Sequence, residues 1–175
     1  MMGRRSRTRR GAAALALATG LLLGTQASAA GVGQKAPEFT APALDGAKNV
    51  SLGAYRGKVV YLDFWASWCP PCLTSLPMLE ELRQQFPSAQ FQILAVNVDQ
   101  DPEKARKFLE RTRIGYPSAT DPKGRIPESF GIETMPTSFL IDRRGVIRYV
   151  HHGFRKSDVP ELRERIGKLV ATRAK

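Results

Sequence analysis

The fold of this chain is decided by residues 64–72, which read FWASWCPPC. They overlap the end of a nearly continuous apolar run, KVVYLDFWA at residues 58–66, whose β-branched and aromatic residues predict a strand buried on both faces. Residues 71–86 carry apolar side chains at helical spacing and predict a helix. The cysteines, Cys69 and Cys72, therefore lie where a buried strand ends and a helix begins.

The start of a helix is a favourable place for a reactive cysteine. Unpaired backbone N–H groups and the positive end of the helix dipole both favour a thiolate at Cys69. Because Pro70 and Pro71 have no N–H, the amide of Cys72 is the main local donor left to that sulfur. The two-residue spacer also lets Cys72 close a disulfide across one helical turn. The pattern thus indicates a redox-active dithiol.

The same cysteine spacing occurs in half of a zinc site and in purely structural disulfides. With only two cysteines, the chain can form neither a four-cysteine zinc site nor a disulfide framework. Its only histidines, His151 and His152, lie far along the chain, and we interpret them as surface residues and not as a metal site. A structural disulfide would close too small a loop to constrain the unfolded chain much. We expect neither a metal nor a cofactor.

Further elements are predicted on both sides of this strand and helix. Prolines and an Asp-Gly turn make residues 36–46 irregular, and a short strand follows. The later chain alternates apolar runs with helical periodicity, which is typical of an α/β fold with a sheet covered by helices on both faces. The predicted strands are 49–52, 91–98, 137–141 and 146–150, and the predicted helices are 102–113 and 157–170, with Ser157 as the cap of the last helix.

Residues 64–72 resemble the active-site segment of thioredoxin-fold proteins. The wider pattern is similar to the secreted TlpA-like family of thiol–disulfide oxidoreductases, a branch that includes the reductases of bacterial cytochrome c maturation. The further matches are Ala36-Pro37-Glu38-Phe39, Leu44-Asp45-Gly46, Gly57-Lys58-Val59-Val60, Met135-Pro136-Thr137 and Phe139-Leu140-Ile141-Asp142. The resemblance implies a thioredoxin-like fold: a central mixed β-sheet flanked by helices, with an N-terminal β extension and a strand–helix segment inserted at residues 99–130.

The resemblance also implies roles for individual residues. It makes Cys69 the nucleophile and Cys72 the resolving thiol. It makes Pro136 a cis proline beside the disulfide. It places Asp63 beneath the cysteines as a buried proton acceptor, where the alternative is an exposed position at the edge of the strand. Ser75 stands where members that serve cytochrome c maturation often have an acidic residue, which weakens that assignment but not the redox chemistry.

The partner is expected to bind around the cysteines. Trp68 either covers the disulfide and meets partner proteins or simply packs against its neighbours. A cis bond at Pro136 would turn the backbone before it toward the cysteines, where an extended partner peptide could pair with it as a strand would. The residues expected to bind substrate are Trp68, Pro70, Thr134 and Met135.

Residues 1–29 have the order of a secretory signal peptide, with a basic start, an apolar run at 11–24 and Ala27-Ser28-Ala29 as a cleavage site. A spanning helix needs about 20 apolar residues, so the run is too short for a membrane anchor. We expect cleavage after Ala29, a thioredoxin-like domain over residues 30–175 and a periplasmic location, where disulfides persist. A reductant there needs electrons from elsewhere, so the resemblance implies a membrane electron donor.

The net charge of +11 first suggests nucleic acid or a membrane surface as a partner. Five of the basic residues, however, lie within the first ten residues, and no acidic residue occurs in residues 1–29. Acidic and basic residues are interleaved along the rest of the chain. We therefore expect protein thiols and disulfides as partners, and no nucleic acid; the sequence leaves the oligomeric state open.

Two rival functions share some of these features. A thiol peroxidase needs Pro-x-x-x-Thr-x-x-Cys, but counting back from Cys69 gives Ala66 and Leu62, and counting back from Cys72 gives Cys69 and Trp65. A copper-handling module would use the two thiolates as soft ligands. Copper retention by the reduced protein against a chelator would distinguish it from an oxidoreductase.

Overall fold

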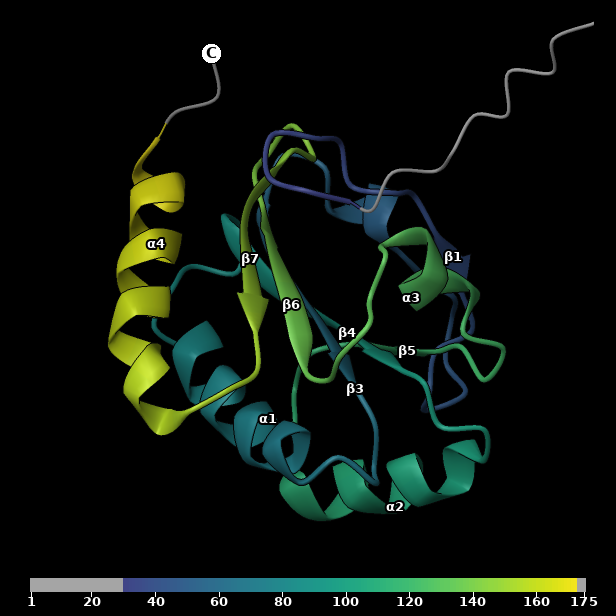
Figure 1. The fold of residues 1–175 in the computed structure, drawn as a ribbon. Coiled ribbons are helices and arrows are strands. Elements are labelled where there is room, and N and C mark those ends of the chain that lie inside the picture. The colour runs from purple at the N-terminus through teal and green to yellow at the C-terminus, as the bar shows by residue number, and fades with distance from the viewer. Residues whose placement is uncertain (1–29, 173–175) are drawn as a thin grey trace, which may run out of the picture.

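A computed structural model describes residues 30–172 as one five-stranded sheet with helices on both faces and a small two-stranded extension (Figure 1). The large sheet has the order β5-β4-β3-β6-β7. Its strands are β3 (Val59–Trp65), β4 (Phe91–Asn97), β5 (Ser118–Thr120), β6 (Thr137–Ile141) and β7 (Ile147–His152). The helices are α1 (Pro70–Arg83), α2 (Pro102–Thr112), α3 (Arg125–Ser129) and α4 (Val159–Ala171), and the extension is β1 (Thr40–Ala41) with β2 (Val50–Ser51). Two 3₁₀ turns, η1 (Leu52–Tyr55) and η2 (Lys156–Asp158), complete it.

The sheet is mixed, as predicted. Strand β3 runs parallel to β4 and antiparallel to β6, while β4–β5 is parallel and β6–β7 is antiparallel. All seven residues of β3 are buried, which confirms the strand that the apolar run predicted. Because β3 is the central strand, the loop that follows it begins in the middle of the sheet, at the C-terminal end of β3.

The two faces of the sheet have separate cores. On one face, Tyr61 and Trp65 of β3 pack with α1, α2 and α4. On the other face, Leu62 and Phe64 pack with α3 and the N-terminal extension. Successive side chains of β3 point to opposite faces, so this one strand contributes residues to both cores. Figure 1 shows α1 and α4 on one side of the sheet and α3 on the other.

Some predicted elements differ from those observed. Strand β5 and helix α3 were not predicted individually; they lie in the segment 99–130 that was expected to hold an insertion. The last helix begins after Asp158 and not after Ser157, because the turn η2 precedes it. The signal peptide predicted at residues 1–29 lies outside the described residues.

The N-terminal segment also closes the outer edge of β5. The N–H of Leu44 donates to the carbonyl of Ser118 at 2.7 Å, and the N–H of Thr120 donates to the carbonyl of Pro42 at 2.9 Å. Between them, Ala43 forms an antiparallel bridge with Ala119. Within residues 30–172, every helix is too short or too polar to cross a lipid bilayer.

Candidate active site

The two cysteines form a disulfide at the N-terminus of α1. Cys69 occupies the capping position of this helix in extended conformation, and its Cα lies 5.3 Å from that of Cys72. The N–H of Cys72 points at the sulfur of Cys69, with an N–S distance of 3.3 Å. This is the donor predicted to remain when the spacer consists of two prolines.

The cysteines differ in their surroundings. Cys69 is 4% exposed, whereas Cys72 is fully buried on the inner face of α1 together with Leu76. Pro70 lies at the surface, and Trp68 is 64% exposed, so Trp68 does not pack in the core. Of the two residues, Cys69 keeps a small exposed surface and Cys72 has none.

The loop before the cysteines is fixed by a buried carboxylate that the sequence reading missed. Asp99, which is 3% exposed, accepts hydrogen bonds from the backbone N–H and the hydroxyl of Ser67, both at 2.9 Å. The side-chain amide of Asn97, at the end of β4, donates to the same carboxylate at 2.6 Å. Asp99 thus ties the loop after β3 to the end of β4.

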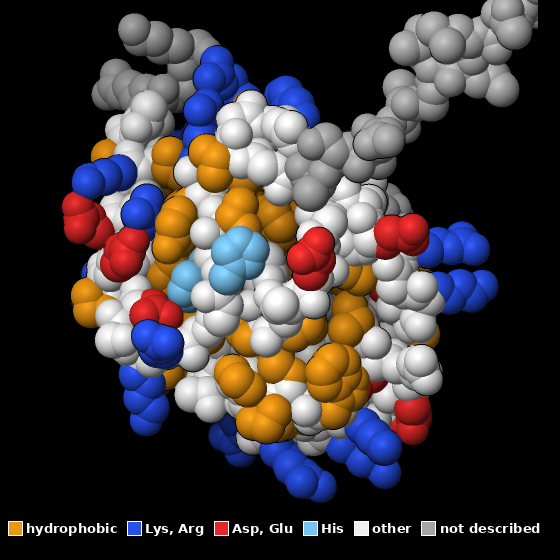
Figure 2. Space-filling model, in the orientation of Figure 1, with side chains coloured by type: hydrophobic (Ala, Val, Ile, Leu, Met, Phe, Trp, Pro, Cys, Tyr) orange, Lys and Arg blue, Asp and Glu red, His pale blue; other side chains and the backbone are white. Residues whose placement is uncertain are grey.

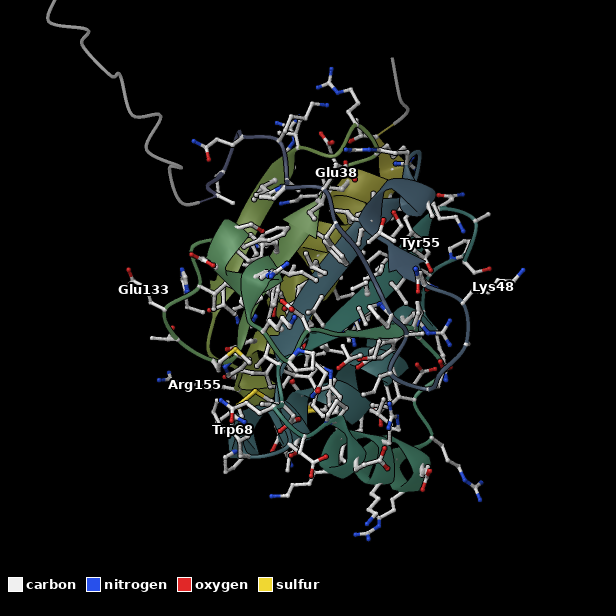
Figure 3. The ribbon with its side chains drawn as sticks, turned by 90° about the vertical axis from the view of Figure 1, so that its right-hand side faces the viewer. Glu38, Lys48, Tyr55, Trp68, Glu133 and Arg155 are labelled. Atoms are coloured by element: carbon white, nitrogen blue, oxygen red, sulfur yellow. A yellow bond between two sulfur atoms is a disulfide. The ribbon has the colours of Figure 1, made fainter. Side chains whose placement is uncertain are left out.

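A groove of about 490 Å³ opens beside this loop. It is lined by Ser67, Trp68, Val98, Asp99, Gln100, Asp101 and Lys104. Hydrophobic side chains also gather at this end of the molecule, where β3 ends and β6 begins, and Lys and Arg side chains border them (Figure 2). Trp68 and Arg155 lie at this same end, opposite Glu38 (Figure 3).

Pro136 lies next to the cysteine loop. The Met135–Pro136 peptide bond is cis, as predicted. Thr137 pairs with Phe64 near the end of β3. The preceding Pro136 therefore lies at the same end of the sheet at which the cysteine loop begins. Met135 packs against the core cluster that contains both cysteines. Its own N–H and carbonyl make no hydrogen bond with the described residues.

Asp63 is buried inside the sheet and not at an exposed edge, with an exposed fraction of 1%. The hydroxyl of Ser138 donates to its Oδ1 at 2.6 Å, while Oδ2 has no hydrogen-bond partner among the described residues. Burial raises the pKa of Asp63 to about 7, against the smaller effect of the Ser138 hydrogen bond, which lowers it. The group can therefore exchange a proton near neutral pH.

Asp63 faces helix α1. It lies between Tyr61 and Trp65 on β3, and both of these share a core cluster with Cys72. The hydroxyl of Tyr116 donates to the carbonyl of Leu76, one turn after Cys72, at 3.1 Å. Burial first, and then the charge of Asp63, raise the pKa of Tyr116.

The interpretation of both histidines as surface residues was wrong for His151. This residue is 7% exposed and hydrogen-bonds to Tyr61 and Asp158, because it lies on the inner face of β7. His152, the next residue, projects from the opposite face of the sheet and is exposed. Among residues 30–172, no three His, Cys, Asp or Glu side chains converge in a way that could hold a metal ion.

Ser75 occupies a buried position in α1. Its hydroxyl donates to the carbonyl of Cys72 at 2.9 Å and is fully enclosed. Sequence reasoning named Ser75 as a departure from the family pattern but assigned it no contact. The residues it missed at the site are Ser67, Asn97, Asp99, Tyr116 and Ser138.

Known proteins resemble the chain in sequence and in structure. The family model described as Redoxin matches residues 31–166. The chain is 35% identical over 143 residues to the thiol-disulfide oxidoreductase ResA of Geobacillus thermodenitrificans, covering 81% of this chain and 82% of that protein. It is 34% identical over 124 residues to the thioredoxin-like protein YneN of Bacillus subtilis, covering 69% and 71%. A crystal structure from Chlorobium tepidum, described as a thiol:disulfide interchange protein DsbE, superposes with a TM-score of 0.77 at 41% identity, covering 82% of this chain and all of that one.

Proposed function

Because this chain belongs to the Redoxin family and is a thiol–disulfide oxidoreductase of thioredoxin-like fold, we propose that Cys69 and Cys72 are its redox-active pair and that it reduces disulfides of partner proteins in the periplasm. The observation that carries this proposal is the pair's position. The sulfur of Cys69, the less buried of the two residues, caps a helix and accepts the N–H of Cys72, while Cys72 is completely buried.

The reaction proceeds in two exchanges. The thiolate of Cys69 attacks one sulfur of the partner's disulfide, which forms a mixed disulfide and releases the partner's first thiolate. The thiolate of Cys72 then attacks the sulfur of Cys69, restores the bond between the two cysteines and releases the second thiolate. Two electrons pass from the dithiol to the partner.

Asp63 serves the second exchange. Cys72 must lose its proton before it attacks, yet a fully buried thiol resists ionisation. The free Oδ2 of Asp63 lies on the face of the sheet that α1 covers and accepts this proton directly or through one water. A carboxyl group with a pKa of about 7 suits this exchange at neutral pH.

The partner binds across Trp68, Pro70 and the loop of Thr134 and Met135. Trp68 offers an exposed apolar side chain next to the reactive cysteine. The unpaired backbone of Met135 can form hydrogen bonds with an extended peptide beside Pro136. Such pairing recognises main chain, so it suits partners of varied sequence.

The location and the electron supply complete the proposal. The signal-peptide pattern of residues 1–29 supports export, cleavage after Ala29 and a mature domain over residues 30–175. In an oxidising compartment the dithiol must be re-reduced, and a membrane electron donor supplies those electrons. Cytochrome c maturation is the pathway proposed from the sequence resemblance. Ser75 departs from the family pattern, because members that serve this pathway often have an acidic residue at that position.

Trapping the mixed disulfide tests the reaction. A Cys72→Ala variant should accumulate covalent adducts with partner proteins in its native cell, because the resolving thiol is gone. The matched Cys69→Ala variant should form none. Non-reducing electrophoresis with and without dithiothreitol, followed by mass spectrometry, identifies the partners and shows whether apocytochromes are among them. Adducts that form through Cys72 in the Cys69→Ala variant would reverse the assigned roles.

Replacing Trp68 by alanine tests the binding surface. Since Trp68 is 64% exposed, the change should shift the free energy of unfolding by no more than about 0.5 kcal/mol. KM for a protein disulfide should rise about tenfold because an apolar anchor is lost, while the rate with a small aromatic disulfide stays unchanged. Val32→Ala is the control, since Val32 is 63% exposed and lies in the N-terminal segment. Equal KM values in wild type and Trp68→Ala would remove Trp68 from the interface.

A further inference from the structure

The loop that follows β7 lies beside the cis-proline. The N–H of Gly153 donates to the carbonyl of Pro136 at 2.8 Å, so the chain after β7 is tied to the proposed partner-binding loop. Phe154 is half-buried and packs against the core cluster that contains both cysteines. The next residue, Arg155, is exposed and lies at the same end of the molecule as Trp68 (Figure 3). The loop after β7 thus borders the site and presents a cation there.

The backbone of Arg155 is held by the carboxylate of Asp158. The N–H of Arg155 donates to Oδ2 of this carboxylate at 2.8 Å, and Nε2 of His151 lies 3.2 Å from the same oxygen. The hydroxyl of Ser157 contacts the other oxygen, Oδ1. The acidic residue nearest to Arg155 in the sequence is therefore occupied by these three groups. Together with the bond from Gly153 to Pro136, these contacts fix the loop at two points.

The guanidinium of Arg155 has no acidic partner within the protein. Among residues 30–172 it forms no ion pair, whereas five other arginines do: Arg56, Arg83, Arg106, Arg148 and Arg165. A guanidinium presents its N–H donors in a planar fork that matches a carboxylate. Because the backbone beneath it is already fixed, binding such a group orders little more than the side chain itself. Arg155 is thus available to bind a carboxylate of another molecule.

The other charged side chains around the site disfavour an acidic group. The groove beside the cysteine loop contains more acidic than basic side chains: Asp99, Asp101 and Lys104. Glu133, in the loop before β6, is exposed and forms no ion pair within the described part of the chain. A carboxylate placed near these acids would be repelled. The side of Arg155, where Lys156 is also exposed, is therefore the favourable place for a negative charge on the partner.

We propose that Arg155 binds an acidic side chain next to the reacting cysteine of the partner, so that the protein favours disulfides flanked by aspartate or glutamate. The inference rests on the proposed reduction of partner disulfides at Cys69. A carboxylate next to a disulfide repels the attacking thiolate, and a guanidinium beside that carboxylate offsets the repulsion. Arg155 determines specificity and takes no part in the exchange of sulfurs.

Symmetric peptide disulfides test this preference. Each half of the peptide carries one cysteine between two copies of a variable residue, which is aspartate, asparagine or lysine. The result then does not depend on the direction in which the peptide binds. Reduced protein is mixed with each peptide, the reaction is quenched with acid, and the released peptide thiol is measured by chromatography. Each rate constant is divided by that of the same peptide with dithiothreitol, which removes the intrinsic reactivity of the disulfide.

Wild type should reduce the aspartate peptide about threefold faster than the asparagine peptide at low ionic strength, as expected for one exposed ion pair. High ionic strength should weaken this preference. Arg155→Gln should abolish the preference, and Arg155→Glu should reverse it in favour of the lysine peptide. Both variants should reduce the asparagine peptide at the wild-type rate, because Arg155 is exposed and its backbone N–H remains.

Lys48→Gln is the matched control for net charge. Lys48 is exposed and lies far from both Trp68 and Arg155 (Figure 3), so the variant should keep the threefold preference. Lys156→Gln removes the neighbouring cation and should keep it as well. If either control abolishes the preference as fully as Arg155→Gln does, general attraction by positive charge explains the result and the assignment to Arg155 is overturned.

The outcomes separate this inference from the proposed function. Equal corrected rates of wild type with the aspartate and asparagine peptides would overturn the inference, while the reduction of disulfides would stand. If wild type reduces neither peptide, and the Cys72→Ala variant traps no partner, the proposed function fails and the inference fails with it.

Discussion

Asp63→Asn should make the folded protein more stable at pH 8, by about 4 kcal/mol, and this gain should vanish near pH 4. The folded state holds the pKa of this carboxyl at about 7, against an ordinary value of 3.8, because burial disfavours the charge. Between these pH values the folded protein binds more protons at this site than the unfolded chain does. The free energy of unfolding therefore falls as the pH rises through this window, by about 1.4 kcal/mol for each pH unit.

Asparagine removes this loss because it carries no charge at any pH, while its side-chain oxygen can still accept from Ser138. Denaturant unfolding of both proteins from pH 4 to pH 9 measures the effect. Asp142→Asn is the control of opposite sign. Burial of Asp142 is outweighed by hydrogen bonds from Val146, Arg148 and Arg144, which hold its pKa below the usual range. Parallel stability curves for wild type and Asp63→Asn would show that folding does not raise the pKa of Asp63.

The same variant should be slow in catalysis. Resolution of the mixed disulfide should be about a hundredfold slower in Asp63→Asn, since the base for Cys72 is lost, while the first attack by Cys69 keeps its rate. In wild type the rate of resolution should rise with pH through about 7, as Asp63 loses its proton. A variant that is more stable and less active would indicate that the fold retains a buried charge for its chemistry.

Asp99→Ala should destabilise the protein by about 3 kcal/mol and disturb the cysteine loop. The change leaves the N–H of Ser67 and the buried amide of Asn97 without their acceptor. Because Ser67 directly precedes Trp68 and Cys69, the loop should lose its fixed position, and turnover of a protein disulfide should fall more than that of a small one. Thermal unfolding and the two rates measure these effects.

Asp101→Ala is the matched control for this prediction. Asp101 lies two residues further along, caps α2 through the N–H of Glu103 and is exposed. Its loss should cost about 1 kcal/mol, which is typical of a helix cap, and leave the cysteine loop in place. Equal effects of Asp99→Ala and Asp101→Ala on the two rates would show that Asp99 does not organise the loop.

The sequence was sufficient for the central strand, the first helix and the position of the cysteines between them. β3 could be recognised because burial on both faces leaves Asp63 as the only charged residue of the strand. β5 could not, because three residues show no periodicity. α3 could not, because a helix of five residues with Pro127 inside it lacks a helical signal.

The contacts around the site depended on pairing between distant strands. Ser138 is an ordinary serine in the sequence, and only its register opposite Asp63 gives it a function. His151 was interpreted as exposed because the predicted strand ended at residue 150, whereas β7 continues to His152 and places His151 on a covered face. The last helix begins at Val159 because Lys156–Asp158 form the 3₁₀ turn η2, in which the carboxylate of Asp158 accepts from the N–H of Arg155.

The short segment along β5 protects one edge of the sheet from pairing with other protein molecules. An open sheet edge is a template on which another extended chain can pair. Residues 42–44 use the outward N–H and carbonyl groups of β5, so a foreign strand finds no partner there. This edge of the sheet is therefore closed to pairing with the strand of another molecule.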